Sequence, residues 1–181
     1  MKENTPSTTA LLVAIIIIIL GGDRQGRKIC PSELINVQTE LIRCTKLIPC
    51  FSLFTLMFQC TVMTKWIRFI CNLYSPGLLN GVGKRKAYIE TAVRNELSIP
   101  GSGGSRHAVE QVLVVASGYD TLALRLAEEF PHVLFYEVDH PATMAIKRRA
   151  VQFYQMSDEG SIDFRRQSIS NLRLISADLT K

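Results

Sequence analysis

Histidine and paired cysteine are scarce in this chain, and their scarcity argues against two common kinds of small protein. The 181 residues include only 3 histidines and 5 cysteines, and no two cysteines form a C-x-x-C pair. The cysteines all lie in the first half, at Cys30, Cys44, Cys50, Cys60 and Cys71. An odd number of cysteines at such spacings fits neither a disulfide framework nor a zinc site. Small buried thiols in a reducing compartment fit better, so we expect a cytoplasmic protein without a metal site.

A long run of like charge is also missing. The formal net charge is +5, but the 21 Lys and Arg stand in short groups such as residues 83–86 (GKRK). A nucleic-acid surface needs clustered cations interleaved with aromatic stacking platforms, so we expect no nucleic-acid partner. With 47% hydrophobic and 20% charged residues, the chain is too apolar for global disorder and long enough to bury a core.

The first of two apolar segments is an unbroken run at residues 10–20, ALLVAIIIIIL. A spanning helix needs about 20 apolar residues, so eleven are few for a membrane span. The run has the length of a signal-peptide core, although Glu3 spoils its basic flank and no clear cleavage site follows. Consecutive isoleucines favour a strand over a helix. We interpret the run as a buried core element, with a membrane or secretory segment as the alternative.

The second apolar segment covers residues 47–63. Its large side chains recur at three- and four-residue steps, which predicts one face of a packed helix: Phe51, Phe54, Phe58, Val62 and Trp66. A length of 17 residues keeps membrane association possible, but we do not favour it. Pro and Gly predict a loop at residues 72–83, and periodicity predicts a helix at residues 84–97. We expect residues 1–80 to form a mainly helical N-terminal segment.

The pattern changes near residue 111, where strands begin to alternate with helices. Short β-branched runs predict strands at residues 111–117 (QVLVVAS), 132–139 (HVLFYEVD) and 172–179 (LRLISADL). Helical patterns fill the intervals at residues 120–130 and 142–155. This rhythm predicts an α/β fold for residues 81–181, a doubly wound Rossmann-like parallel sheet.

Candidate binding residues follow the strands of this sheet. Residues 116–118 (Ala-Ser-Gly) form a small turn after the first strand, Glu137 and Asp139 end the second, and Asp178 ends the third. Ligands of such sheets bind at the carboxyl ends of the strands, where small residues admit a ligand and an acid can bond a ribose diol. The turn lacks the G-x-G-x-x-G pattern, so a nucleoside ligand without a pyrophosphate fits better than a nicotinamide cofactor. No nucleophile or histidine dyad stands out, and we interpret His140 as a turn residue.

The segments VVASGYDTLALRL, FPHVLFYEVDHPATMAIKR and LRLISADLTK together resemble the leucine carboxyl methyltransferase family of class I S-adenosylmethionine-dependent methyltransferases. The family pattern is roughly L-G-A-G-x-D-T-x-x-x-R-L, then a strand ending in E-x-D-x-P, then A-D-L. The resemblance covers residues 83–181. It implies a methyltransferase fold, S-adenosyl-L-methionine as cofactor, and methylation of a carboxylate on a protein C-terminal leucine or a small acid. A carboxylate needs no general base, so we expect catalysis chiefly by positioning.

The resemblance also implies a set of cofactor-binding residues. Arg85 would pair with the methionine carboxylate, and residues 116–118 would line the methionine and ribose. Asp139 would accept hydrogen bonds from the ribose hydroxyls, and Asp178 and Leu179 would flank the adenine. The full set is Arg85, Ala116, Ser117, Gly118, Asp139, Asp178 and Leu179.

Two further residues are expected to support the fold, and the chain differs from the family pattern in two respects. Asp120 and Arg125 are interpreted as a buried turn acid and its ion-pair partner. Ala116 stands where the family has glycine, and its methyl group would crowd the cofactor unless the local φ is negative. Family members continue beyond A-D-L, so we expect a C-terminally truncated chain. An inactive cofactor-binding homologue and a membrane-associated protein are the alternatives, and a nicotinamide oxidoreductase is a more distant one.

Overall fold

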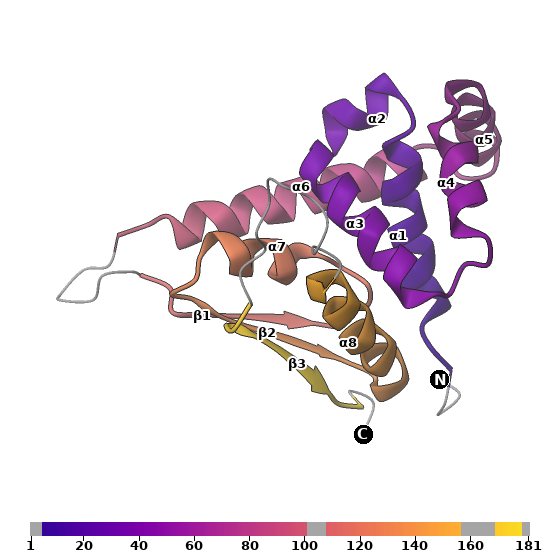
Figure 1. Cartoon of the computed structure of the whole chain (residues 1–181). Coiled ribbons are helices and arrows are strands. Elements are labelled where there is room, and N and C mark those ends of the chain that lie inside the picture. The colour runs from indigo at the N-terminus through magenta and orange to yellow at the C-terminus, as the bar shows by residue number, and fades with distance from the viewer. Residues whose placement is uncertain (1–4, 101–107, 157–168, 179–181) are drawn as a thin grey trace.

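The computed structural model describes residues 5–100, 108–156 and 169–178, and within them helices precede and then alternate with a parallel sheet (Figure 1). The helices before the sheet are α1 (Thr8–Leu20), α2 (Arg24–Ile29), α3 (Ser32–Thr45), α4 (Phe51–Gln59), α5 (Thr61–Tyr74) and α6 (Leu78–Leu97). The alternating part consists of β1 (Gln111–Val115), α7 (Leu122–Glu129), β2 (Leu134–Asp139), α8 (Pro141–Met156) and β3 (Leu172–Ser176).

The sheet confirms the predicted strand–helix alternation. Its order is β1-β2-β3 and both pairings are parallel, so the carboxyl ends of the strands share one edge. In Figure 1 the helices lie on one side of this sheet. On the other side Leu113, Val115 and Ile175 are 62%, 57% and 41% exposed. Among the described residues, the core of the α/β part therefore lies on one face of the sheet.

The isoleucine-rich run forms a helix, α1, so the strand preference expected of residues 10–20 is wrong. Residues 16–20 are each at most 6% exposed, and α1 packs against α3 and α6. A helix that is apolar all round can be stabilised by burial on all sides, which outweighs the small helix-propensity penalty of isoleucine. Ser7 caps the helix by accepting a hydrogen bond from the Ala10 N–H. No helix in the described ranges combines the length and the apolar character that crossing a membrane requires.

The second apolar segment is two helices rather than the single packed helix that we expected. Cys60 has an extended conformation and separates α4 from α5. Phe51 and Phe54 pack into the core beside α1, but Val62 and Trp66 are both 60% exposed. The side chain of Phe58 lies outside the described part of the chain. The periodic stripe thus turns outward after the break.

The predicted loop at residues 72–83 is also much shorter than expected. Only residues 75–77 connect α5 to α6, and Gly77 supplies the turn with a φ of +80°. Gly83 lies inside α6, where a Cβ atom would come within 2.6 Å of the Leu20 side chain. The glycine therefore permits close packing of α6 on the N-terminal helices rather than ending a helix.

Candidate functional site

A cavity of about 290 Å³ lies at the carboxyl end of β1, between the sheet and two helices. Its walls come mainly from α1, α6 and the turn after β1, with Gln38 of α3 and the end of β1 completing them. The α1 side is small and apolar, with Ala10 and Ala14, whereas α6 contributes Arg85 and Lys86. The turn contributes residues 116–118. The structure thus brings Arg85 together with the predicted turn, although the two are about thirty residues apart in the sequence.

The turn after β1 has two residues in the left-handed region. Ala116 has a φ of +53° and Gly118 a φ of +52°. The condition for tolerating Ala116, a negative φ, is not met, so this residue is strained. At Gly118 a Cβ atom would lie 2.7 Å from the Cβ atom of Ala10, so α1 rests directly on the glycine. The close approach of α1 to the turn depends on the missing side chain.

Asp139 anchors this turn to β2. Its Oδ2 atom accepts a hydrogen bond from the Gly118 N–H at 2.6 Å, and its Oδ1 atom accepts one from the His140 N–H at 2.6 Å. Asp139 stands behind the turn and does not line the cavity wall. His140 accepts a hydrogen bond from the Ala142 N–H, as a residue of the turn would.

Of the two predicted adenine-flanking residues, the structure describes only Asp178. Asp178 lies two residues beyond the end of β3 and does not line the cavity. Leu179 lies outside the described residues. The expectation that Asp178 ends the third strand is corrected by the shorter extent of β3, which stops at Ser176.

Asp120 and Arg125 do not pair with each other, which corrects the expected scaffold ion pair. Asp120 pairs with Lys86 of α6, and its backbone carbonyl accepts a hydrogen bond from Lys147 of α8 at 2.6 Å. Burial raises the pKa of Asp120, but Lys86, Lys147 and a backbone N–H outweigh burial and hold this pKa below its usual range. Asp120 therefore stays ionised, and it neutralises Lys86 at the cavity wall.

Arg125 instead forms a two-pronged ion pair with Glu90 of α6. The distances from its Nη1 and Nη2 atoms to the two carboxylate oxygens are 2.5 Å and 2.8 Å. Burial raises the pKa of Glu90, but Arg125 and Arg94 outweigh it and lower this pKa below the ordinary value. The pair lies inside the protein and joins α6 to α7, because Arg125 projects from α7 across to the neighbouring helix.

A second buried ion pair lies beneath the turn. The side chains of Glu137 in β2 and Lys147 in α8 are both 0% exposed and contact each other. Burial raises the pKa of Glu137 further than Lys147 lowers it. Tyr119 is also buried, which together with the nearby Asp139 raises the pKa of its phenol to about 12. Its hydroxyl has no hydrogen-bond partner within the described ranges, although Tyr119 lines the cavity.

The electrostatics of the cavity depend on one cation in particular. Lys86 and Lys147 are both neutralised by acids, but Arg85 has no ion-pair partner in the part of the chain that the structure describes. A free guanidinium beside small backbone groups suits a ligand that carries a carboxylate. The carboxylate of Asp139 lies just behind the same turn. This arrangement can hold an anionic group at α6 and hydroxyl groups toward β2.

The roles of Lys86 and Glu90 were not predicted from the sequence, although their spacing indicates a common helix face. Lys86, Glu90 and Arg94 recur at four-residue steps and therefore lie on one face of α6. Only an apolar face had been assigned to this helix. Lys147 had no comparable signal, because its partner Glu137 lies in another element.

Comparison with known proteins identifies one family whose model matches this chain. The family model described as leucine carboxyl methyltransferase matches residues 72–181, which include α6, the turn after β1 and all three strands. No curated protein and no solved structure gives a significant match.

Proposed function

The chain belongs to the leucine carboxyl methyltransferase family, and we propose that this methyltransferase binds S-adenosyl-L-methionine and methylates a carboxylate oxygen. The cofactor supplies a methyl group on a sulfonium centre. The acceptor class is a protein C-terminal leucine or a small carboxylic acid. The cysteine spacing, which fits no disulfide framework, supports a reducing, cytoplasmic setting for this activity, although the expectation of buried thiols holds for Cys30 alone.

The unpaired Arg85 at the cavity is the observation that carries the proposal. Its guanidinium would hold the methionine carboxylate, and the backbone of residues 116–118 would lie along the methionine and ribose. Asp139 would accept hydrogen bonds from the ribose hydroxyls. Each of its carboxylate oxygens already accepts one hydrogen bond from a backbone N–H and can accept a second. Asp178 and Leu179 would flank the adenine.

The dimensions and donor set of the cavity support a ligand of this kind. Its volume of about 290 Å³ is near the lower end of the range for small-molecule sites. Arg85 lines one wall as a free cation, and the carboxylate of Asp139 lies behind the turn that forms another, which suits a ligand with a carboxylate at one end and hydroxyls further along. For a carboxylate acceptor the protein needs to orient the reacting atoms and need not remove a proton.

Calorimetric titration with S-adenosylhomocysteine tests cofactor binding. We expect micromolar affinity in the wild-type chain and a loss of about tenfold or more in Arg85→Gln, because a charge-assisted contact is removed. Lys84→Gln is the matched control, since Lys84 is the neighbouring exposed cation and does not line the cavity. Equal affinity in Arg85→Gln and the wild type would contradict the assignment. Asp139 is a poorer test residue, because its carboxylate also anchors the turn.

Methyl transfer is tested separately from binding. The chain is incubated with S-adenosylmethionine labelled in its methyl group and with a peptide that ends in leucine, its C-terminally amidated form, or small carboxylic acids. Transfer to the free-acid peptide but not to the amide supports a carboxylate acceptor. Binding of the cofactor with no transfer to any acceptor supports the alternative of an inactive cofactor-binding homologue.

A further inference from the structure

The helical pair α4–α5 exposes large apolar side chains that a water-facing helix normally lacks. Six of them have exposed fractions between 59% and 70%: Leu53, Leu56, Val62, Trp66, Phe69 and Leu73. We call these six residues the α4–α5 apolar face. Exposed patches of this kind mark surfaces that contact another apolar phase or molecule.

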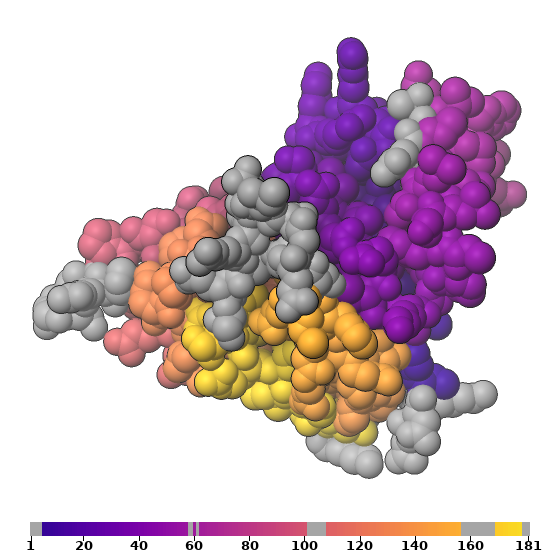
Figure 2. Space-filling model, in the orientation of Figure 1, coloured from indigo at the N-terminus to yellow at the C-terminus, as the bar shows by residue number. Residues whose placement is uncertain are grey.

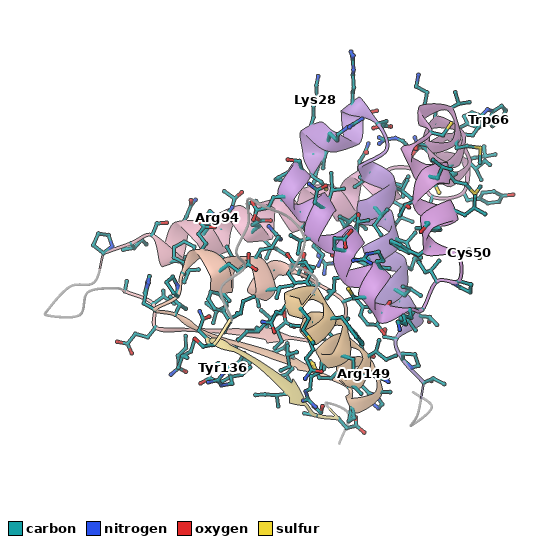
Figure 3. All side chains as sticks on the ribbon, viewed as in Figure 1. Lys28, Cys50, Trp66, Arg94, Tyr136 and Arg149 are labelled. Carbon is teal, nitrogen blue, oxygen red and sulfur yellow. The ribbon has the colours of Figure 1, made fainter. Side chains whose placement is uncertain are left out.

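Helix α5 turns a mixed polar and apolar side toward the protein and its larger apolar side chains outward. Its inward side includes Thr64, Ile67, Arg68 and Cys71, and Arg68 is tied to Asp23 and Asn80. The outward side carries the aromatic and aliphatic residues instead. Figure 2 shows α4 and α5 along an outer edge of the molecule, and Figure 3 shows Trp66 at this edge, pointing away from the protein. Polar contacts of Arg68 and apolar contacts of Ile67 and Cys71 therefore hold the helix in place, while its aromatic side chains face outward.

The exposed charge around this face is mainly positive, because Asp23, which lines the adjoining cleft, is buried and paired with Arg68. Residues 41–89 contain seven Lys and Arg and no Asp or Glu. A cleft between α2 and α5 is lined by Arg24, Lys65 and Phe69, among others, and has a volume of about 670 Å³. Arg27 and Lys28 of α2 are exposed nearby, and Figure 3 places Lys28 and Trp66 at the same end of the molecule, away from the sheet. Cations thus border the apolar face.

We propose that the α4–α5 apolar face docks on a membrane surface that carries anionic phospholipids. Apolar side chains bordered by Lys and Arg are the signature of helices that lie in the headgroup region, with aromatic rings at the interface and cations at the phosphates. With 9 and 14 residues, α4 and α5 are too short to span the bilayer. A second copy is a poorer occupant, because pairing this face with itself would bring cations against cations. The proposal is independent of the cofactor site, since none of the α4 and α5 side chains that the structure describes lines that cavity.

Trp66 is the only tryptophan of the chain, so its fluorescence reports docking without a label. The full chain is titrated with vesicles of phosphatidylcholine alone or mixed with phosphatidylserine. We expect a blue shift of the emission and reduced quenching by acrylamide with the mixed vesicles, a smaller effect with phosphatidylcholine, and weakening by salt. No blue shift with the mixed vesicles would overturn the proposal. A blue shift that grows with protein concentration in the absence of vesicles would instead show that a second copy covers the face.

Variants separate the apolar and the charged contributions. Phe69→Ser with Leu73→Ser keeps the reporter, and we expect it to weaken vesicle affinity by about tenfold or more. The matched control is Leu113→Ser with Ile175→Ser on the open side of the sheet, which removes exposed apolar surface elsewhere and should leave affinity unchanged. Arg24→Gln with Lys65→Gln should weaken binding to mixed vesicles only. Circular dichroism checks folding, and equal vesicle affinity in the apolar variant and its control would overturn the proposal.

Discussion

Ala116 holds the backbone of the turn in a conformation that disfavours any residue with a side chain. A left-handed conformation costs an L residue about 1–2 kcal/mol, because its Cβ atom crowds the carbonyl oxygen. Ala116 also lines the cavity, beside Ser117. Backbone strain at such a position is typical of functional sites and is compensated by the surrounding structure. Here the compensation includes the hydrogen bond from Gly118 to Asp139.

Ala116→Gly should therefore stabilise the protein. Glycine adopts a positive φ without the Cβ penalty, and we expect the free energy of unfolding to rise by about 0.5–1 kcal/mol. Thermal denaturation measures this change. Ala145→Gly is the control of opposite sign, because Ala145 is exposed within α8 and glycine destabilises a helix interior. A lower melting temperature for Ala116→Gly would contradict the strain at this turn.

The turn at residues 116–118 was predictable from the sequence, whereas the partner of Arg125 was not. The strand-ending turn at residues 116–118 was predictable, because its small residues directly follow a β-branched run. The ion-pair partner of Arg125 was not predictable. A buried arginine requires an acid nearby, but the sequence does not show which element supplies that acid. Glu90, on a helix 35 residues earlier, takes the place that Asp120 was expected to fill. The strain at Ala116 also required the backbone angle.

At the scale of elements, α6 and α7 are joined by a network of two acids and two arginines. Glu90 lies between Arg125 and Arg94, and Arg94 also contacts Glu129 of α7. The two acids differ in burial, since the side chain of Glu90 is 5% exposed and that of Glu129 is 44% exposed. Removing one partner of the inner pair should therefore cost far more stability than removing one partner of the outer pair.

Glu90→Gln should destabilise the protein by about 3 kcal/mol at neutral pH, because it leaves the buried guanidinium of Arg125 without a counter-charge. Glu129→Gln is the matched control and should cost below about 1 kcal/mol. Denaturant unfolding measures both values. Equal effects of the two substitutions would show that the inner pair has no special role.

The difference between the wild type and Glu90→Gln should depend on pH. The folded-state pKa of Glu90 is lowered, so its contribution is fully present above the ordinary carboxyl pKa and is lost as pH falls through the lower folded value. We expect the two unfolding free energies to begin to approach each other below the ordinary carboxyl pKa of 4.5 and to meet once pH lies below the folded-state value. A difference that stays constant to strongly acidic pH would contradict this linkage.

Prediction of whole elements succeeded where local pattern and tertiary environment agree. The three strands and the helices α7 and α8 follow from periodicity, because each buries one face against the same sheet. The isoleucine run of α1 was assigned the wrong secondary structure, since burial on all sides overrides the intrinsic preference of its residues. The break at Cys60, which separates α4 from α5, had no sequence signal.

At the scale of the whole molecule, the cavity is assembled from parts that lie far apart in the sequence. Ala10 and Ala14 of α1 face the turn at residues 116–118 across about a hundred residues of chain. A ligand in this cavity would touch the first helix and the sheet at once. Its binding free energy would therefore hold α1 against the α/β part.

S-adenosylhomocysteine at about 100 times its dissociation constant should stabilise the chain by about 2.7 kcal/mol, which corresponds to a melting shift of about 5–10 °C. Hydrogen exchange should show added protection in α1 as well as in the turn after β1. Vesicles should instead protect α4 and α5. Protection by the ligand that is confined to the sheet would contradict the role of α1 as a cavity wall.

The acid-free stretch at residues 41–89 also lacks histidine, the side chain whose ordinary pKa puts its charge change between about pH 5 and pH 8. The local positive charge beside the α4–α5 apolar face is therefore constant over the physiological range. Vesicle binding should stay level across that range, whereas a protein that senses endosomal acidity would change. A signal that altered attachment would have to bring its own charge, for example a phosphate on the exposed hydroxyl of Ser52 in α4.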